Sequence, residues 1–272
     1  MRRLNVTLTT WLSHSLRVLL LLAVFKTGGQ RLRLLVVWLA LEGRFWFGWF
    51  PGRSFRLVWR GPRGDVSARL GDVSELWAIL QTFVNGEYDR VRQLAPRVIL
   101  DLGANIGIAA LYFDAVCPGA RIVAVEAVPR TYELLRENTA HLDNVTCVHA
   151  ALTDAVGEAT VYSGKRSLAS SLTATPDLPH ADVVPATTLE RLGEELGYGT
   201  AEFVKHDIEG AELRVIPASA AALSGAQAIA FEFHQQPTEA TLWSLLKELP
   251  DFELRRIRGD TSGRAVVDLV RR

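Results

Sequence analysis

The sequence predicts an α/β protein with a mostly parallel, seven-stranded sheet and helices on both faces. From residue 97 onward, short apolar runs alternate with helical stretches, which is typical of parallel strands joined by crossover helices. Near the carboxyl terminus, two further apolar runs flank the turn sequence RGDTSG and predict a closing hairpin. The chain has 272 residues, 49% of them hydrophobic, so it is long and apolar enough to bury such a sheet.

Seven runs have the length and composition of strands. They are residues 97–102, 121–127, 145–152, 201–207, 228–234, 252–257 and 265–270. Helical spacing of apolar residues falls between most of these runs. It covers about 108–116, 130–141, 187–196 and 210–223. The segment 163–186 is rich in Ser, Thr and Pro, and we expect it to form a long loop over the carboxyl edge of the sheet.

The first part of the chain differs from the rest, and we expect an extension over residues 1–53 followed by one domain over residues 54–272. Within that domain, residues 54–60 and 66–70 alternate apolar and polar side chains and predict a two-stranded hairpin. Residues 73–84 have helical spacing and stop at an Asn-Gly pair, which is a common end of a helix.

The extension is basic and hydrophobic. Residues 1–63 carry eleven Lys and Arg against one acid, whereas the remaining residues carry nineteen against twenty-nine acids. Its apolar runs at 16–25 and 34–41 are shorter than the roughly 18 residues of a spanning helix. The aromatic stretch GRFWFGWFPGR, with arginines beside the rings, suits a water–lipid boundary. Packing on the domain or on a second copy, contact with a membrane surface, and an anchor or signal all stay open.

Composition also bears on partners and location. Nothing in the sequence resembles a nucleic-acid reading module, and most of the chain is acidic, so we expect no nucleic-acid partner. The two cysteines, Cys117 and Cys147, exclude a disulfide framework and a multi-cysteine zinc site. They fit a reducing cytoplasm, where the basic extension would place the protein at the inner face of the membrane.

The stretch VILDLGANIGIAALYF carries the first sign of a ligand. An acid, Asp101, ends a strand, and Gly103, Asn105 and Gly107 form the turn before a helix. Glu126 ends the next strand, 19 residues beyond Gly107, where a carboxylate can accept hydrogen bonds from ribose hydroxyls. Asn105 replaces the glycine that would approach a pyrophosphate, and an acid before the turn suits an ammonium group. The pattern therefore favours S-adenosylmethionine over a dinucleotide.

Four segments resemble the FkbM-type methyltransferase family. They are VILDLGANIGIAAL, IVAVEAVPRTYELLREN, VTCVHAALTDAVGEATVY and FVKHDIEGAE, within roughly residues 95–235. The last segment is the most diagnostic, because the family's usual form is Lys-Ile-Asp-Val-Glu-Gly-x-Glu. The resemblance implies the class I, Rossmann-like S-adenosylmethionine fold and methyl transfer to oxygen, often on sugars, polyketides or lipid-linked glycans. It does not fix the acceptor.

Two positions depart from the family's pattern. His206 stands where an aliphatic residue is usual, and it puts an ionisable group beside Asp207. The segment VEAVP replaces the usual Glu-Pro-x-Pro, which should loosen the turn without removing the acid.

Candidate catalytic residues lie at the ends of the fourth and fifth strands. Asp207 is expected to orient the acceptor hydroxyl or to act as general base, and Glu209 could serve as base or metal ligand. His234 has the reference pKa best suited to proton transfer near neutral pH. For Glu209, the alternative is a helix N-terminus that simply favours an acid.

Other residues are expected to contact the cofactor or the substrate. Asp154 follows the third strand, near where this fold often contacts the adenine amine. Lys205, His206, Ser171 and Glu232 are candidate substrate-binding residues. No compact ligand motif supports a metal, and none is expected.

Three functions remain in competition. The first is an S-adenosylmethionine-dependent O-methyltransferase acting on a glycan, glycolipid or polyketide-type hydroxyl, with N-methylation as a variant. The second is a catalytically inactive nucleoside-binding protein of the same fold, and the third is an NAD(P)-dependent oxidoreductase. The oligomeric state is open, a homo-oligomer included.

Overall fold

The computed structural model describes residues 18–164, 170–174, 176–208, 212–234, 237–259 and 264–272. The chain divides into two compact units, one up to Glu87 and one from Tyr88 to Arg272. Each is described by itself.

The first unit pairs a long helix with a hairpin. Helix α2 (Gly28–Phe47) starts at a capping box, in which the Thr27 hydroxyl accepts from the Gln30 amide and the Gln30 side chain accepts from the Thr27 amide. It packs against strand β1 (Phe55–Arg60), which pairs antiparallel with β2 (Asp65–Leu70), as predicted. The predicted helix follows as α3 (Glu75–Ile79) and a π-helical turn (Leu80–Val84). In the part of the chain that the structure describes, no helix combines the length and the apolar character needed to cross a membrane.

The second unit contains the predicted seven-stranded sheet. Its strands are β3 (Val98–Leu102), β4 (Arg121–Glu126), β5 (Val145–His149), β10 (Phe203–His206), β11 (Ala228–Phe233), β12 (Phe252–Gly259) and β13 (Ala265–Arg271). They lie in the order β12-β13-β11-β10-β3-β4-β5, and only β13 runs antiparallel to the others. The central strands are buried on both faces, which explains their almost continuous apolar sequences.

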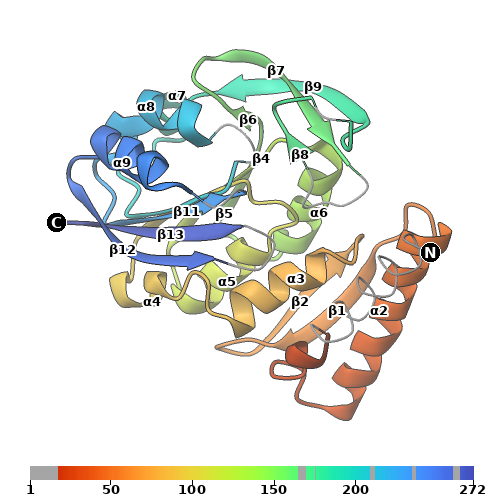
Figure 1. The fold of residues 1–272 in the computed structure, drawn as a ribbon. Helices are drawn as coiled ribbons and strands as arrows, with labels where there is room; N and C mark the ends of the chain where they lie inside the picture. Colours follow the sequence, from red (N-terminus) through yellow and green to blue (C-terminus); the bar gives the residue numbers. More distant parts are fainter. Residues whose placement is uncertain (1–17, 165–169, 175, 209–211, 235–236, 260–263) are drawn as a thin grey trace. The chain divides into compact units, whose positions relative to one another are not determined.

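Helices cover both faces of this sheet (Figure 1). One group contains α4 (Arg90–Leu94), α5 (Ile108–Val116) and α6 (Pro129–Thr139), and the other contains α7 (Leu189–Leu196), α8 (Glu212–Leu223) and α9 (Glu239–Glu248). Four of these agree with the helical stretches predicted from the sequence. Helix α9 was not predicted, although Thr238 caps it by accepting from the Thr241 amide.

The prediction of a long loop over residues 163–186 was wrong for much of that segment. A four-stranded sheet contains β6 (Ala151–Leu152), β7 (Gly157–Ser163), β8 (Ser170–Ser171) and β9 (His180–Thr187), in the order β6-β9-β7-β8. Residues 180–186 of strand β9 pair with β7, and Pro185 falls just before the two residues that pair with β6. Pro185 has Glu158 of β7 as its register partner and no partner in β6, so β9 accommodates the proline that suggested a loop.

The predicted strand 145–152 is likewise two strands. β5 belongs to the large sheet and β6 to the small one, and Ala150 separates them. The chain therefore crosses from one sheet to the other directly beside the carboxyl end of β4.

Candidate active site

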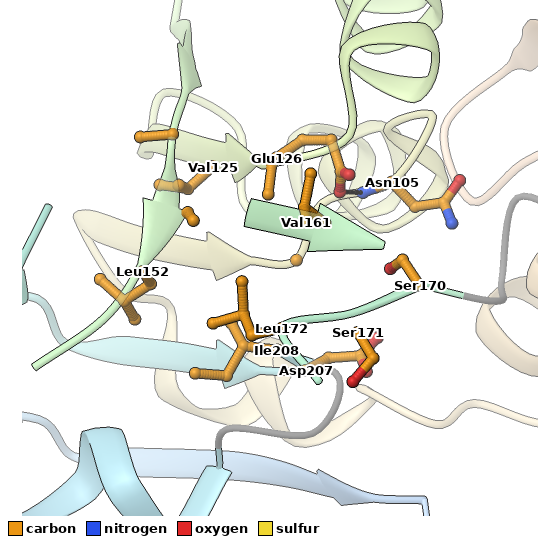
Figure 2. A pocket seen from close by; sticks show the side chains of 14 residues that line it. Asn105, Val125, Glu126, Leu152, Val161, Ser170, Ser171, Leu172, Asp207 and Ile208 are labelled. Carbon is orange, nitrogen blue, oxygen red and sulfur yellow. Dashed lines mark hydrogen bonds between the residues drawn. The ribbon is translucent and has the colours of Figure 1, made fainter. Parts of the chain in front are cut away.

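A pocket opens at the carboxyl ends of β3, β4 and β10 (Figure 2). The chain goes from β3 to β4 and β5 on one side and returns to β10 on the other, so this is the switch point where open α/β sheets bind ligands. The pocket region contains about 590 Å³ of space free of protein atoms, open solvent included. Its lining is Gly103, Asn105, Val125, Glu126, Ala127, Ala150, Ala151, Leu152, Val161, Ser170, Ser171, Leu172, Asp207 and Ile208.

The glycine turn after β3 is required by close packing as well as by any ligand. Gly103 has φ +75°, and a Cβ built there would lie 1.8 Å from the carbonyl oxygen of Asp207. Gly107 has φ +89°, and its Cβ would lie 2.8 Å from Leu135 on α6. Between them, Asn105 adopts φ +50°, which Asn tolerates better than most residues. Gly103 and Asn105 line the pocket, whereas Gly107 does not.

Glu126 lines the pocket from the end of β4 and also holds the turn in place. One carboxylate oxygen accepts from the Asn105 amide at 2.8 Å (Figure 2), and the other accepts from the Val128 amide at 2.8 Å and the Thr131 hydroxyl at 2.9 Å. Burial raises the pKa of Glu126, and these three donors oppose that effect. A carboxylate has about four acceptor positions, so one stays available to a ligand hydroxyl.

Lys205 and two acids form a buried ion-pair group below the pocket. Nζ of Lys205 lies 3.1 Å from Oδ1 of Asp101 and 3.2 Å from Oδ2 of Asp207. The same nitrogen donates a hydrogen bond to the Gly103 carbonyl at 2.7 Å. Burial lowers the pKa of Lys205, but Asp101, Asp207 and Glu232 outweigh it and raise that pKa above its usual value. Lys205 is therefore charged, and it ties the end of β10 to the turn after β3.

Of the two acids paired with Lys205, Asp207 is the one that lines the pocket. Burial by itself would raise the pKa of Asp207, but Lys205, His234 and Arg264 hold it below the usual range, so the carboxylate is ionised. Nε2 of His234 lies 3.5 Å from Oδ1 of Asp207 and 3.9 Å from Oε1 of Glu232. Arg264 in turn forms an ion pair with Glu232. The ends of β10, β11 and β13 thus gather two carboxylates, an imidazole and a guanidinium beside the pocket.

Eight predicted site residues lie outside the pocket lining or the described chain. They are Asp101, Gly107, Asp154, Lys205, His206, Glu209, Glu232 and His234. Asp101 is fully buried and paired with Lys205, and His206 is fully buried with its ring 4.6 Å from that of Phe231. Asp154 is exposed toward Arg214, 3.6 Å away. Glu209 lies outside the described residues. The structure brings Gly103, Asn105, Glu126, Ser171 and Asp207 together in the pocket.

Sequence reasoning missed two kinds of residue. Arg264 follows a polar turn and carries no local signal, because its partner Glu232 is on another strand. The apolar wall of the pocket was also missed, since Leu152, Val161 and Leu172 read as ordinary core residues. The Ser-rich stretch was a usable signal, because β8 brings Ser170 and Ser171 to the same pocket that Asp207 lines (Figure 2).

Comparison with known families narrows the set of competing functions. The model of the methyltransferase FkbM domain matches residues 101–258, more than half of the chain. The chain belongs to the FkbM methyltransferase family. Its sheet and helices are those of the class I methyltransferase fold, and the oxidoreductase alternative is thereby set aside. A search of curated proteins finds no significant match to the sequence.

Solved structures of other methyltransferases are similar in fold. The FkbM methyltransferase from Methylobacillus flagellatus KT superposes with a TM-score of 0.47 at 16% identity, covering 72% of this chain and 54% of that one. This chain thus spans about half the length of that protein. The Aeropyrum pernix fibrillarin bound to S-adenosyl-L-methionine gives a TM-score of 0.44 at 14% identity, with coverage of 81% and 83%. The Bacillus cereus O-methyltransferase bound to S-adenosylhomocysteine gives a TM-score of 0.41 at 14% identity, covering 69% of this chain and 80% of that one.

Proposed function

We propose that this FkbM-family chain transfers a methyl group from S-adenosylmethionine to a hydroxyl of a glycan, glycolipid or polyketide-type small molecule. The observation that carries the proposal is the meeting of two groups in one pocket: Glu126 at one strand end and the ionised Asp207, beside His234, at another. The first suits the nucleoside of the methyl donor, and the second suits the proton that a hydroxyl must lose. The acceptor class follows the family resemblance.

The pocket residues fit S-adenosylmethionine. Glu126 keeps one acceptor position for a ribose hydroxyl, and Gly103 and Asn105 expose backbone beside it. Val125, Ala127 and Leu152 are among the apolar side chains that can cover a flat base. No cationic side chain lines the pocket among the described residues, which suits a ligand that is itself positively charged. A direct contact to Asp101 or Asp154 is not part of this proposal, since neither lines the pocket.

The reaction asks the protein to align three atoms and to accept a proton. The bound cofactor supplies a methyl group on a sulfonium, which makes carbon susceptible to in-line attack. Asp207, ionised and lining the pocket, accepts the hydrogen bond of the acceptor hydroxyl and orients its oxygen. Asp207 also takes this proton as the new carbon–oxygen bond forms, and His234, with Nε2 3.5 Å from Oδ1 of Asp207, holds the carboxylate in position. Ser170 and Ser171 offer further hydrogen bonds to the acceptor.

This arrangement favours oxygen over nitrogen as the acceptor atom. A neutral amine attacks with a free lone pair and needs no base before the displacement, whereas a hydroxyl gains nucleophilicity as its proton leaves. A carboxylate–imidazole pair beside the pocket is useful for the second reaction and of little use for the first.

The same side chains have the spacing of a metal site, but their charges argue against one. The ligand atoms of Asp207, Glu232 and His234 lie within 4.8 Å of one another. Lys205 and Arg264 already pair with the two carboxylates and would repel a divalent cation. We therefore propose transfer without a metal, and dialysis against EDTA should leave turnover unchanged. Restoration of a lost activity by magnesium alone would reverse this assignment.

The free thiols of Cys117 and Cys147 agree with a reducing compartment such as the cytoplasm, which we also propose as the location.

The test is transfer of a radiolabelled methyl group from S-adenosylmethionine into glycan, lipid and small-molecule fractions. Wild type should label a product that survives alkali, as a methyl ether does and a methyl ester does not. Asp207→Asn should reduce turnover by about 10²-fold or more while binding S-adenosylhomocysteine normally. His234→Gln should do the same, whereas His141→Gln, at an exposed position, should have no effect. Binding without transfer in every fraction would favour the inactive nucleoside-binding protein, and full activity of Asp207→Asn would remove that residue from the mechanism.

A further inference from the structure

Helix α2 is apolar on two opposite faces, although only one of them is covered within its own unit. Leu34, Val37, Trp38 and Leu41 are buried. Leu32, Leu35, Val36 and Leu39 are exposed, with 63%, 45%, 57% and 51% of their surface accessible. Both sets follow the i, i+3, i+4, i+7 spacing of a single helix face. We call the second set the exposed stripe, and an apolar surface of this kind requires a cover or a partner.

An aromatic turn continues the exposed stripe at the end of the helix. Gly43 comes four residues after Leu39 on the same face, and a Cβ built at Gly43 would lie 2.4 Å from the Trp49 ring. The missing side chain therefore makes room for Trp49 at the end of the stripe. Trp49 remains 56% exposed, and the Phe47 ring, 70% exposed, stacks on it with centroids 5.2 Å apart.

This turn is held in place by specific contacts. Gly48 ends α2 in the left-handed conformation with φ +70°. The guanidinium of Arg44 then donates to the carbonyls of Phe50, Arg53 and Gly71, and it lies over the Phe55 ring at 5.7 Å. The turn that exposes the rings of Phe47 and Trp49 to solvent is therefore held by the hydrogen bonds of Arg44.

The charge around this surface has one sign. Residues 18–63 contain eight Lys and Arg and a single acid, Glu42. That acid is buried and accepts hydrogen bonds from the indoles of Trp38 and Trp46. At about 100° per residue, Arg31 and Arg33 flank the exposed stripe on its two sides, and both are exposed. Apolar and aromatic side chains bordered by arginines are the pattern of helices that lie in a lipid interface.

We propose that the exposed stripe of α2 and the turn carrying Phe47 and Trp49 bind an anionic lipid surface. The helix lies flat on this surface, with Leu and Trp side chains among the acyl chains and the arginines at the headgroups. The charge distinguishes lipid from a second copy of the chain. Two copies joined through this face would bring together two segments with a net charge of +7 each (eight cations minus one acid), whereas an anionic bilayer neutralises that charge. The proposal does not depend on the identity of the methyl acceptor.

The experiment is co-sedimentation of the full-length protein with vesicles. Wild type should bind vesicles of equal parts phosphatidylglycerol and phosphatidylcholine, and should bind vesicles of phosphatidylcholine alone far more weakly. Its affinity for the anionic vesicles should fall as NaCl rises from about 0.05 to about 0.5 M, because salt screens the attraction. Leu35→Gln/Leu39→Gln and Trp49→Ala should each weaken binding by about tenfold or more. The matched control is Val156→Gln/Val183→Gln, two exposed apolar positions in the second unit, at 63% and 66%, which should bind like wild type.

Three outcomes would overturn the proposal. If wild type does not bind anionic vesicles, the chain has no lipid-binding surface. If the variants bind vesicles as tightly as wild type, another part of the chain is responsible for binding. Variants that turn a dimer into a monomer in sedimentation velocity, without any vesicle binding by wild type, would make this face an interface between copies. The salt titration uses wild type alone, so it stands even where a variant fails to fold.

Discussion

Nζ of Lys205 lies 3.2 Å from Oδ2 of Asp207, and the lysine side chain is only 5% exposed. This contact keeps the pocket carboxylate ionised, and the second contact of the lysine, to Asp101, anchors it to β3. The acid before the glycine turn thus acts on the site through Lys205. The sequence suggested that Asp101 binds the ammonium group of the ligand, but in the structure Asp101 pairs with the ammonium group of Lys205 instead.

Removing the lysine charge should therefore destabilise the fold. Lys205→Met leaves Asp101 without its counterion and takes from Asp207 the cation 3.2 Å away, and breaking a buried pair in this way costs about 3–5 kcal/mol. The measurement is urea unfolding followed by circular dichroism. Lys247→Met, at an exposed position of α9, is the control and should cost less than about 0.5 kcal/mol. Equal stability of the two variants would show that Lys205 does not hold the site together.

The charge of Lys205 can be tested by measuring, as a function of pH, the difference in unfolding free energy between wild type and Lys205→Met. Its carboxylate neighbours raise its folded pKa against the opposing effect of burial. The resulting stability is fully present below the unfolded pKa of about 10.4 and is lost as pH rises through the higher folded pKa. The gap between wild type and Lys205→Met should therefore be constant from about pH 7 to 10 and shrink above that range. A gap that instead widens from about pH 7 to 10 would show that the folded pKa lies below the unfolded one, so that the buried lysine is neutral.

Gly103 should be irreplaceable for a steric reason. Gly103→Ala places a Cβ 1.8 Å from the Asp207 carbonyl oxygen, and the backbone there has φ +75°. Gly119 has a similar φ of +81° with nothing within 4 Å, so Gly119→Ala measures the conformational strain alone. We expect a loss of about 1 kcal/mol for Gly119→Ala and at least about 2 kcal/mol more for Gly103→Ala. Unfolding curves that coincide for the two variants would refute the close approach of β3 and β10.

Much of the large sheet could be predicted because its strands are buried on both faces. Runs such as VILDL and AIAFEF are apolar except for one acid each, and the structure puts them in one sheet on either side of β10. The small sheet could not be predicted, because β9 is half-exposed, carries Pro185 and gains its strand character only by pairing with β7. Local propensity is weak where tertiary pairing decides.

The site was predictable to the extent that it is local. Glu126 and the glycine turn have a fixed spacing, and Asp207 stands in a motif. The contacts between Lys205 and Asp101 and between Arg264 and Glu232 join different strands, and no spacing reveals them. The sequence assigned Asp101 to a ligand for this reason, since its neighbour across the sheet was not visible.

Glu126 provides the most direct test of the central claim that the pocket takes the nucleoside of S-adenosylmethionine. The measurement is isothermal titration calorimetry with S-adenosylhomocysteine. Wild type should bind one equivalent, Glu126→Gln should bind at least about tenfold more weakly through the loss of a charged acceptor, and Glu133→Gln, exposed on α6, should bind like wild type. Absence of binding to wild type, or equal affinity of the two Gln variants, would contradict the account.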